Sequence, residues 1–124
     1  MTFEDVNILG NLIDTTYGKS SSPAGDYSIK SDLAGETLTL KYTTVVHFAS
    51  ERSLRDQVAR CKEEAHSRLD DYLKLIKSGF KDAAGTSLKT EMSGHDDNVE
   101  LISSTSNSPR KIAYYRMSHK FTLG

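Results

Sequence analysis

An apolar repeat with helical spacing, between positions 54 and 80, is the feature that most limits what this chain can fold into. Its members follow one another at spacings of 4, 3, 4, 4, 3, 4 and 4, and they are Leu54, Val58, Cys61, Ala65, Leu69, Tyr72, Ile76 and Phe80. Because an α-helix turns once every 3.6 residues, this spacing places all of them on one face. Ser50, just before the repeat, is a favourable N-cap residue. The sequence therefore predicts an amphipathic helix with one apolar face to bury.

The length of this helix is large for so small a chain. Unbroken from Glu51 to Ser78, it would be about 42 Å long at 1.5 Å per residue. A domain of 124 residues has a radius of gyration of about 14 Å. The helix must therefore bend, break near Gly79 or extend beyond its sheet. An overhanging end needs something to contact, which is a first indication of a subunit in an assembly.

A second, shorter helix is predicted before it. Thr2 is a suitable cap, acids occupy the first turn, and apolar residues recur at spacings of three and four up to about Gly18. Residues 19–26 are predicted to form a polar, flexible loop. Alternating residues then predict a hairpin, with a strand over 27–31, a turn over 33–35 and a long strand over 37–48.

The remainder of the chain reads as further strands. Gly85 is a suitable helix stop, and the segments that follow are a short strand in "SLKTEM", a turn in "SGHDDN", a strand in "VELIS", a polar loop in "STSNSP" and a closing strand over 112–123. The element order α-β-β-α-β-β-β predicts an α+β fold, with a mainly antiparallel sheet of about five strands packed by both helices. With 36% hydrophobic and 27% charged residues, residues 1–124 are expected to form a single folded domain.

The closing strand separates its charge from its apolar residues. Ala113, Tyr115, Met117, His119, Phe121 and Leu123 form one row, and Ile112, Tyr114, Arg116, Ser118, Lys120 and Thr122 form the other. The first row predicts a core face, with His119 as its odd member. A platform that stacks nucleic-acid bases needs aromatic and basic side chains together on one exposed face. The basic row therefore indicates a protein contact more than a nucleic-acid site.

Charge is distributed unevenly although the formal net charge is only −1. Three acids and no base occupy residues 1–18, whereas no acid follows Glu100. The expected interaction surface comprises Arg110, Lys111, Tyr114, Arg116 and Lys120 at the basic end and Glu4, Asp5 and Asp14 at the acidic end. Unlike ends of this kind can join copies head to tail through a heterologous interface.

No catalytic, cofactor or metal site is expected. The chain lacks the nucleophile elbow and the glycine-rich phosphate loops. His95, Asp96 and Asp97 are adjacent in an expected turn, where their side chains diverge and do not make a metal site. Cys61 lies within the apolar stripe and is expected to be a packed, inert thiol. The class expected from these residues is a non-enzymatic protein.

No apolar run reaches the roughly 18 residues that span a bilayer, and the first residues are acidic where a signal peptide would be basic. Neither membrane insertion nor secretion is therefore expected.

The order of elements and the closing stretch "TSNSPRKIAYYRMSHKFTL" resemble the tail terminator and tail-completion (neck) proteins of tailed bacteriophages. The resemblance implies a virion structural protein that is assembled in the host cytoplasm. It also implies a homo-oligomer, often a ring, that contacts other virion proteins. The alternative is a small nucleic-acid-binding protein that uses the basic outer row of the closing strand. Phosphate contacts would make such binding strongly dependent on salt.

Overall fold

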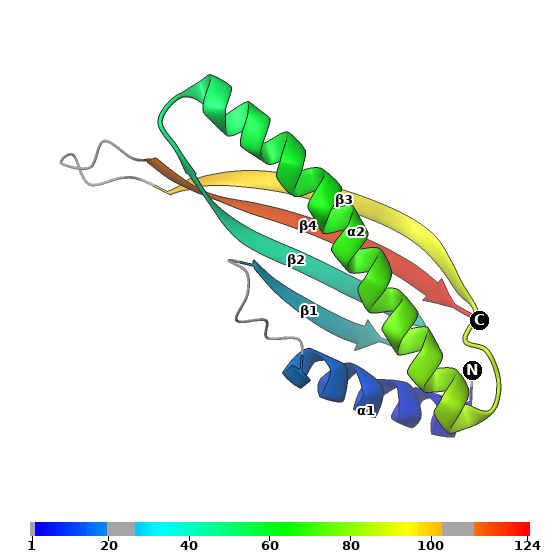
Figure 1. Ribbon diagram of the computed structural model, residues 1–124. Helices are drawn as coiled ribbons and strands as arrows, with labels where there is room; N and C mark the ends of the chain where they lie inside the picture. Colours follow the sequence, from blue (N-terminus) through cyan, green and yellow to red (C-terminus); the bar gives the residue numbers. More distant parts are fainter. Residues whose placement is uncertain (1, 20–26, 103–110) are drawn as a thin grey trace.

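The computed structural model describes residues 2–19, 27–102 and 111–124. Two helices and four strands follow one another in the order α1 (Phe3–Lys19), β1 (Tyr27–Ala34), β2 (Thr37–Phe48), α2 (Glu51–Ala84), β3 (Thr90–Ile102) and β4 (Lys111–Leu123). Figure 1 shows α2 running diagonally across the sheet, with α1 beside β1. The predicted α+β class with an antiparallel sheet is confirmed.

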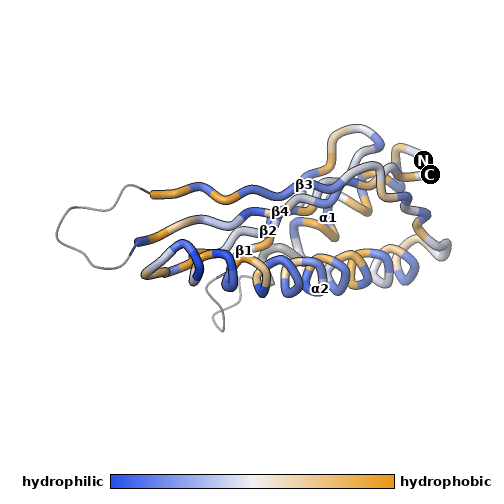
Figure 2. Tube along the Cα trace, turned by 90° about the horizontal axis from the view of Figure 1, so that it is seen from above, coloured by the Kyte–Doolittle hydropathy of each residue, from blue (hydrophilic) through white to orange (hydrophobic). Residues whose placement is uncertain are grey.

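The sheet has the strand order β1-β2-β4-β3, and each neighbouring pair is antiparallel. Seen from its edge, the molecule has a strand layer and a layer containing α2 (Figure 2). The closing strand β4 is therefore a central strand, while β1 and β3 form the two edges. Because α1 packs on both β1 and α2, the edge at β1 has a helix beside it.

The core lies between α2 and the central strands β2 and β4. It is built from alternate residues of β2 and β4 and from the second half of the predicted stripe of α2, where Ala65, Leu69, Tyr72, Ile76 and Phe80 are buried. Leu54, Val58 and Cys61, nearer the start of α2, are half-buried. The two predicted rows of β4 are confirmed, since Tyr115 and Met117 are buried and Lys120 is exposed. The helix is thus tightly packed toward its end and less covered at its beginning.

The predicted ends of α2 are confirmed, but the break considered near Gly79 is wrong. The Ser50 side chain accepts a hydrogen bond from the Ser53 N–H, and Gly85 ends the helix with φ 76° and a hydrogen bond from its N–H to the carbonyl oxygen of Lys81. Gly79 lies inside the helix, at the place where α1 packs closely against α2. A Cβ at this position would lie 3.1 Å from Leu12 Cδ2, so the missing side chain makes room for the contact between the helices.

The sheet has four strands and not the predicted five, because β3 is continuous. The turn expected over residues 93–98 is absent from β3, which pairs with β4 from Thr90 opposite Leu123 to Ile102 opposite Ile112. A register shift between Met92 and Gly94 indicates a β-bulge. Pairing with a long central partner thus overrides the turn-like composition of this segment.

Two further boundaries differ from the predictions. Strand β1 extends to Ala34, and helix α1 includes Lys19. The turn predicted over 33–35 lies at residues 35–36, because Leu33 and Ala34 pair with β2, and Gly35 takes φ 62° in it. The rest of the predicted polar loop, residues 20–26, lies outside the described residues, as do residues 104–109 and Arg110. None of the described helices is both long enough and apolar enough to cross a membrane.

Candidate functional site

The uncovered edge strand β3 is the most distinctive surface of the molecule. It spans 13 residues, and β4 is its one paired neighbour among the described residues. Each side chain from Glu91 to Leu101 is exposed, with only Gly94 half-buried. Such a strand presents unpaired backbone N–H and C=O groups to any chain that approaches it.

Part of this strand is apolar on the side that faces the helix layer. Met92, Val99 and Leu101 lie opposite Phe121, Tyr115 and Ala113 of the buried row of β4. They are nevertheless 45%, 39% and 65% exposed, because α2 packs on β2 and β4 and does not cover β3. This row continues the core face into solvent, which is typical of a surface that a partner covers.

A groove lies between this row and the beginning of α2. It encloses about 640 Å³, and apolar side chains of three strands and of the helix line it, namely Phe48, Leu54, Leu101, Ile102 and Ile112. Arg55 and Lys111 add two cations and Glu51 adds one carboxylate. The groove thus combines an apolar floor with a rim that has one excess positive charge.

Strand β3 carries acids but no lysine or arginine. Its charged residues are Glu91, Asp96, Asp97 and Glu100, and His95 is its one further titratable side chain. Arg116 of β4 neutralises Glu100 through an ion pair. The remaining carboxylates leave the exposed edge negatively charged.

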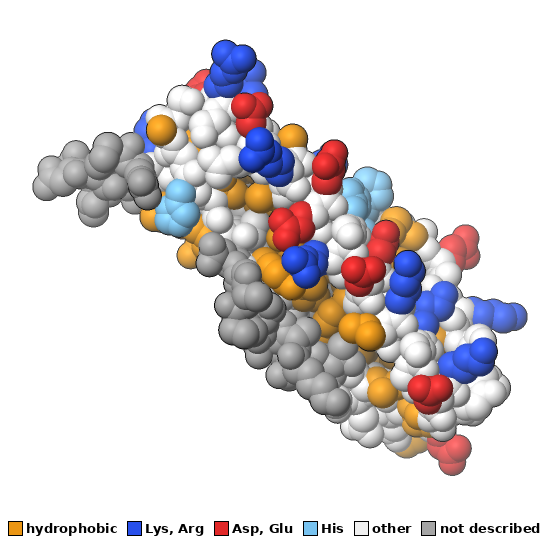
Figure 3. Space-filling view, viewed as in Figure 1, with side chains coloured by type: hydrophobic (Ala, Val, Ile, Leu, Met, Phe, Trp, Pro, Cys, Tyr) orange, Lys and Arg blue, Asp and Glu red, His pale blue; other side chains and the backbone are white. Residues whose placement is uncertain are grey.

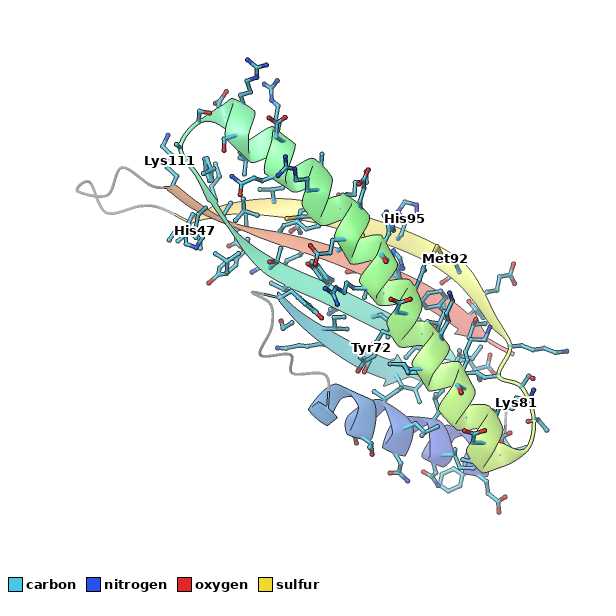
Figure 4. All side chains as sticks on the ribbon, in the orientation of Figure 1. His47, Tyr72, Lys81, Met92, His95 and Lys111 are labelled. Carbon is cyan, nitrogen blue, oxygen red and sulfur yellow. The ribbon has the colours of Figure 1, made fainter. Side chains whose placement is uncertain are left out.

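The structure divides the predicted basic surface between the two faces of the sheet. Tyr114, Arg116 and Lys120 lie on the face away from α2, where Arg116 packs over the Tyr114 ring at 5.1 Å from its centroid and pairs with Glu100. Lys111 lies on the opposite face, since it is opposite the buried Phe48, and it is near the beginning of α2 (Figure 4). Tyr114, Arg116 and Lys120 therefore do not form one surface with Lys111. Arg110 lies outside the described residues.

The predicted acids of the first helix are placed at or near the surface. Glu4 and Asp14 are exposed, and Asp5 is half-buried. Asp5 accepts a hydrogen bond from the Thr2 N–H, while the Thr2 hydroxyl oxygen accepts one from the Asp5 N–H. This reciprocal cap fixes the start of α1. Next to these acids Phe3 is 79% exposed, the most exposed large apolar residue of the described chain.

Three histidines from three elements converge on the helix side of the sheet. Nδ1 of His66 on α2 lies 3.0 Å from Nε2 of His119 on β4, and their ring centroids are 5.0 Å apart. His95 of β3 is directly opposite His119 in the sheet, with ring centroids 6.4 Å apart. The fourth histidine, His47, is exposed on the other face.

Burial lowers the pKa of His119 below its usual value, and the neighbouring His66 and His95 act in the same direction, against the attraction of Asp70. His119 is only 1% exposed. Its Nδ1 atom finds no hydrogen-bond partner among the residues that the structure describes. Burial in the core therefore favours the neutral form of His119.

The histidine cluster does not form a metal site. Within residues 2–19, 27–102 and 111–124, no group of three or more His, Cys, Asp or Glu side chains is placed to hold a metal ion. Cys61 is the one cysteine of the chain and is half-buried. Burial raises the pKa of its thiol, and the nearby Glu64 raises it further. A raised pKa reduces the thiolate that a catalytic cysteine needs.

Neither the open edge nor the histidine cluster was predicted from the sequence. The edge was hidden because a strand exposed on both faces shows no alternation of apolar and polar residues. The one signal for the cluster was His119 itself, a titratable residue inside an otherwise apolar row. Comparison with known proteins finds no family model, no curated protein and no solved structure that matches this chain.

Proposed function

We propose that this chain is a non-enzymatic structural subunit that assembles with copies of itself through the open edge of its sheet. The observation that carries the proposal is the helix-side row of β3, where Val99 and Leu101 are exposed beside an apolar groove. An apolar row of this kind continues the core face and loses its contact with water when a partner covers it. The tail terminator or neck proteins of tailed bacteriophages are the specific class that we propose.

The charge of β3 supports a particular kind of interface. If β3 paired with β3 of a second copy, the carboxylates of the two strands would face each other, and like charges across paired strands are destabilising. A surface that does not match itself must meet a different surface of its neighbour. Repeated contacts of that heterologous type close into rings or extend into filaments, which agrees with the proposed ring-forming class.

The mass of the protein in solution tests this proposal. We expect light scattering to give a multiple of the 13.7 kDa monomer, and we expect Leu101→Asp to lower it. Leu75→Asp is the matched control, because Leu75 is a leucine with similar exposure, 61% against 65%, on α2. A wild-type chain that stays monomeric at high concentration contradicts the proposal, and so does an equal loss of mass in both variants.

Measurements at low and high salt distinguish the proposed assembly from the nucleic-acid alternative. A chain that bound a single-stranded oligonucleotide would lose affinity steeply as salt is added. A contact based on Leu101 and its apolar neighbours would retain its mass. Oligonucleotide binding by a monomer would favour the alternative.

A further inference from the structure

We infer that the exposed start of α1 in one copy binds the apolar groove beside β3 in the next copy, with Phe3 as the side chain that enters it. This inference rests on the proposed function, because it names the two surfaces through which the copies would join. Each surface is described first, and then their fit.

The groove is an apolar site with a basic rim. Leu101 is exposed at its side, Leu54 is half-buried, and Phe48 is buried at its floor. Arg55 and Lys111 both line it. Figure 3 shows lysine and arginine side chains, with acidic side chains beside them, both at the end of the molecule where α2 begins and at the end where α2 finishes. Such a site suits an apolar side chain that has carboxylates next to it.

The start of α1 has this chemistry. Phe3 is 79% exposed, and Glu4 and Asp5 follow it in the first turn. The reciprocal bonds between Thr2 and Asp5 hold this turn in a helical conformation, so little ordering is needed before it binds. Aromatic side chains that enter apolar pockets supply a large share of the affinity in protein interfaces.

The two surfaces lie at opposite ends of an elongated molecule. The groove adjoins the first turns of α2, whereas α1 begins near the last turns of α2 (Figure 1). At 1.5 Å per residue, the 34 residues of α2 separate these ends by about 50 Å. One molecule therefore cannot place its own Phe3 in its own groove, and a second copy is the occupant to which the inference commits.

Charge complementarity favours this occupant over a second groove or a second α1. The rim of the groove carries two cations and one carboxylate, Glu51, while the first turn of α1 carries two carboxylates and no cation. Two grooves facing each other would bring like charges together, as would two α1 ends. The contact is therefore heterologous, in agreement with the charge of β3.

Three substitutions test the contact, with the self-association constant measured by analytical ultracentrifugation. Phe3→Ala is expected to weaken self-association by about tenfold or more. Lys111→Glu is expected to weaken it, and Glu4→Lys combined with Lys111→Glu is expected to recover part of the loss. Lys120→Glu is the matched control, because this exposed lysine lies on the same strand but on the other face. It is expected to leave association unchanged.

The outcomes separate this inference from the proposed function. If Leu101→Asp dissociates the oligomer while Phe3→Ala does not, the assembly is real and Phe3 is not its contact, so the inference is overturned alone. Equal effects of Lys111→Glu and Lys120→Glu would show a general charge effect and would also overturn it. A wild-type monomer overturns both. Circular dichroism on each variant confirms that the fold is retained, and Phe3 and Lys111 are exposed, so no core contact is lost.

Discussion

His66 of α2 and His119 of β4 are joined by a hydrogen bond of 3.0 Å between Nδ1 and Nε2, in a chain that has only four histidines. His95 lies opposite His119 on the neighbouring strand β3. The three imidazoles thus connect the helix layer to the edge that we propose for assembly. This cluster lies between the buried core and the open strand.

The histidine cluster predicts a pH dependence of stability. Burial holds the pKa of folded His119 below its usual value of 6.5, so the unfolded chain binds this proton more strongly. The contribution to stability is fully present above about pH 6.5 and is lost as the pH falls from there toward the folded pKa. We expect the free energy of unfolding in urea to decrease between pH 7 and pH 5.

Two variants assign this dependence to its residue. His119→Gln removes the titrating group and is expected to reduce the slope between pH 7 and pH 5, although it lowers stability throughout. His47→Gln changes an exposed histidine and is expected to leave the slope unchanged. The assignment is wrong if the full slope persists in His119→Gln.

The apolar stripe of α2 predicts the cost of truncating its side chains. Leu69 has no exposed surface, whereas Leu75 of the same helix is 61% exposed. Leu69→Ala is expected to lower the free energy of unfolding by about 3 kcal/mol, because the substitution leaves a cavity in the core. Leu75→Ala is expected to change it by less than about 0.5 kcal/mol. Guanidinium unfolding of the two variants measures both values, and similar losses would contradict the orientation of the helix.

A hydrogen bond between side chains of β4 and β3 predicts a measurable coupling between the two residues. The Tyr115 hydroxyl donates to Asp97 Oδ2 at 2.9 Å. Burial of Tyr115 raises the pKa of its hydroxyl, and the bond to Asp97 raises it further. A double-mutant cycle of Tyr115→Phe and Asp97→Asn is expected to give a coupling free energy of about 1 kcal/mol. Additive effects of the two substitutions would show that the bond does not contribute.

The long helix and the central strands could be predicted because their residues carry a clear period. The spacing from Leu54 to Phe80 fits only a helix, and Ser50 and Gly85 mark its ends. In the same way, alternation over 37–48 and 112–123 assigns the buried row of each central strand. These elements have one buried and one exposed face, and such a difference is what a hydropathy pattern records.

Strand β3 could not be predicted in the same way, because both of its faces are exposed. The segment 93–98 contains Ser, Gly, Asp and Asn, which are typical of a turn, and no buried residue contradicted that interpretation. Pairing with β4 from Thr90 to Ile102 decides its conformation, and this partner is known only from the fold. The sequence also left open a break near Gly79, as one of three alternatives, because the contact of Gly79 with Leu12 comes from a distant part of the chain.

The interaction surface remains a prediction. Glu4, Asp5 and Lys111 lie on the two surfaces that we propose to pair, whereas Asp14 lies further along α1 and Arg116 and Lys120 lie on the other face of the sheet. The groove depends on how the beginning of α2 lies over the sheet, and the exposure of Phe3 depends on how α1 packs. A sequence pattern contains no information on that relation between elements.

The most direct test of the account is a disulfide between unlike surfaces of two copies. In a Cys61→Ser background, one chain carries Glu4→Cys and another carries Lys111→Cys, so that Phe3 and Leu101 are kept, and each is oxidised alone and in an equal mixture. We predict a covalent dimer in the mixture and little in either chain alone, because the contact joins different surfaces. A mixture that forms no more dimer than the separate chains, or no more than with Lys120→Cys in place of Lys111→Cys, would contradict the head-to-tail contact between the start of α1 and the groove.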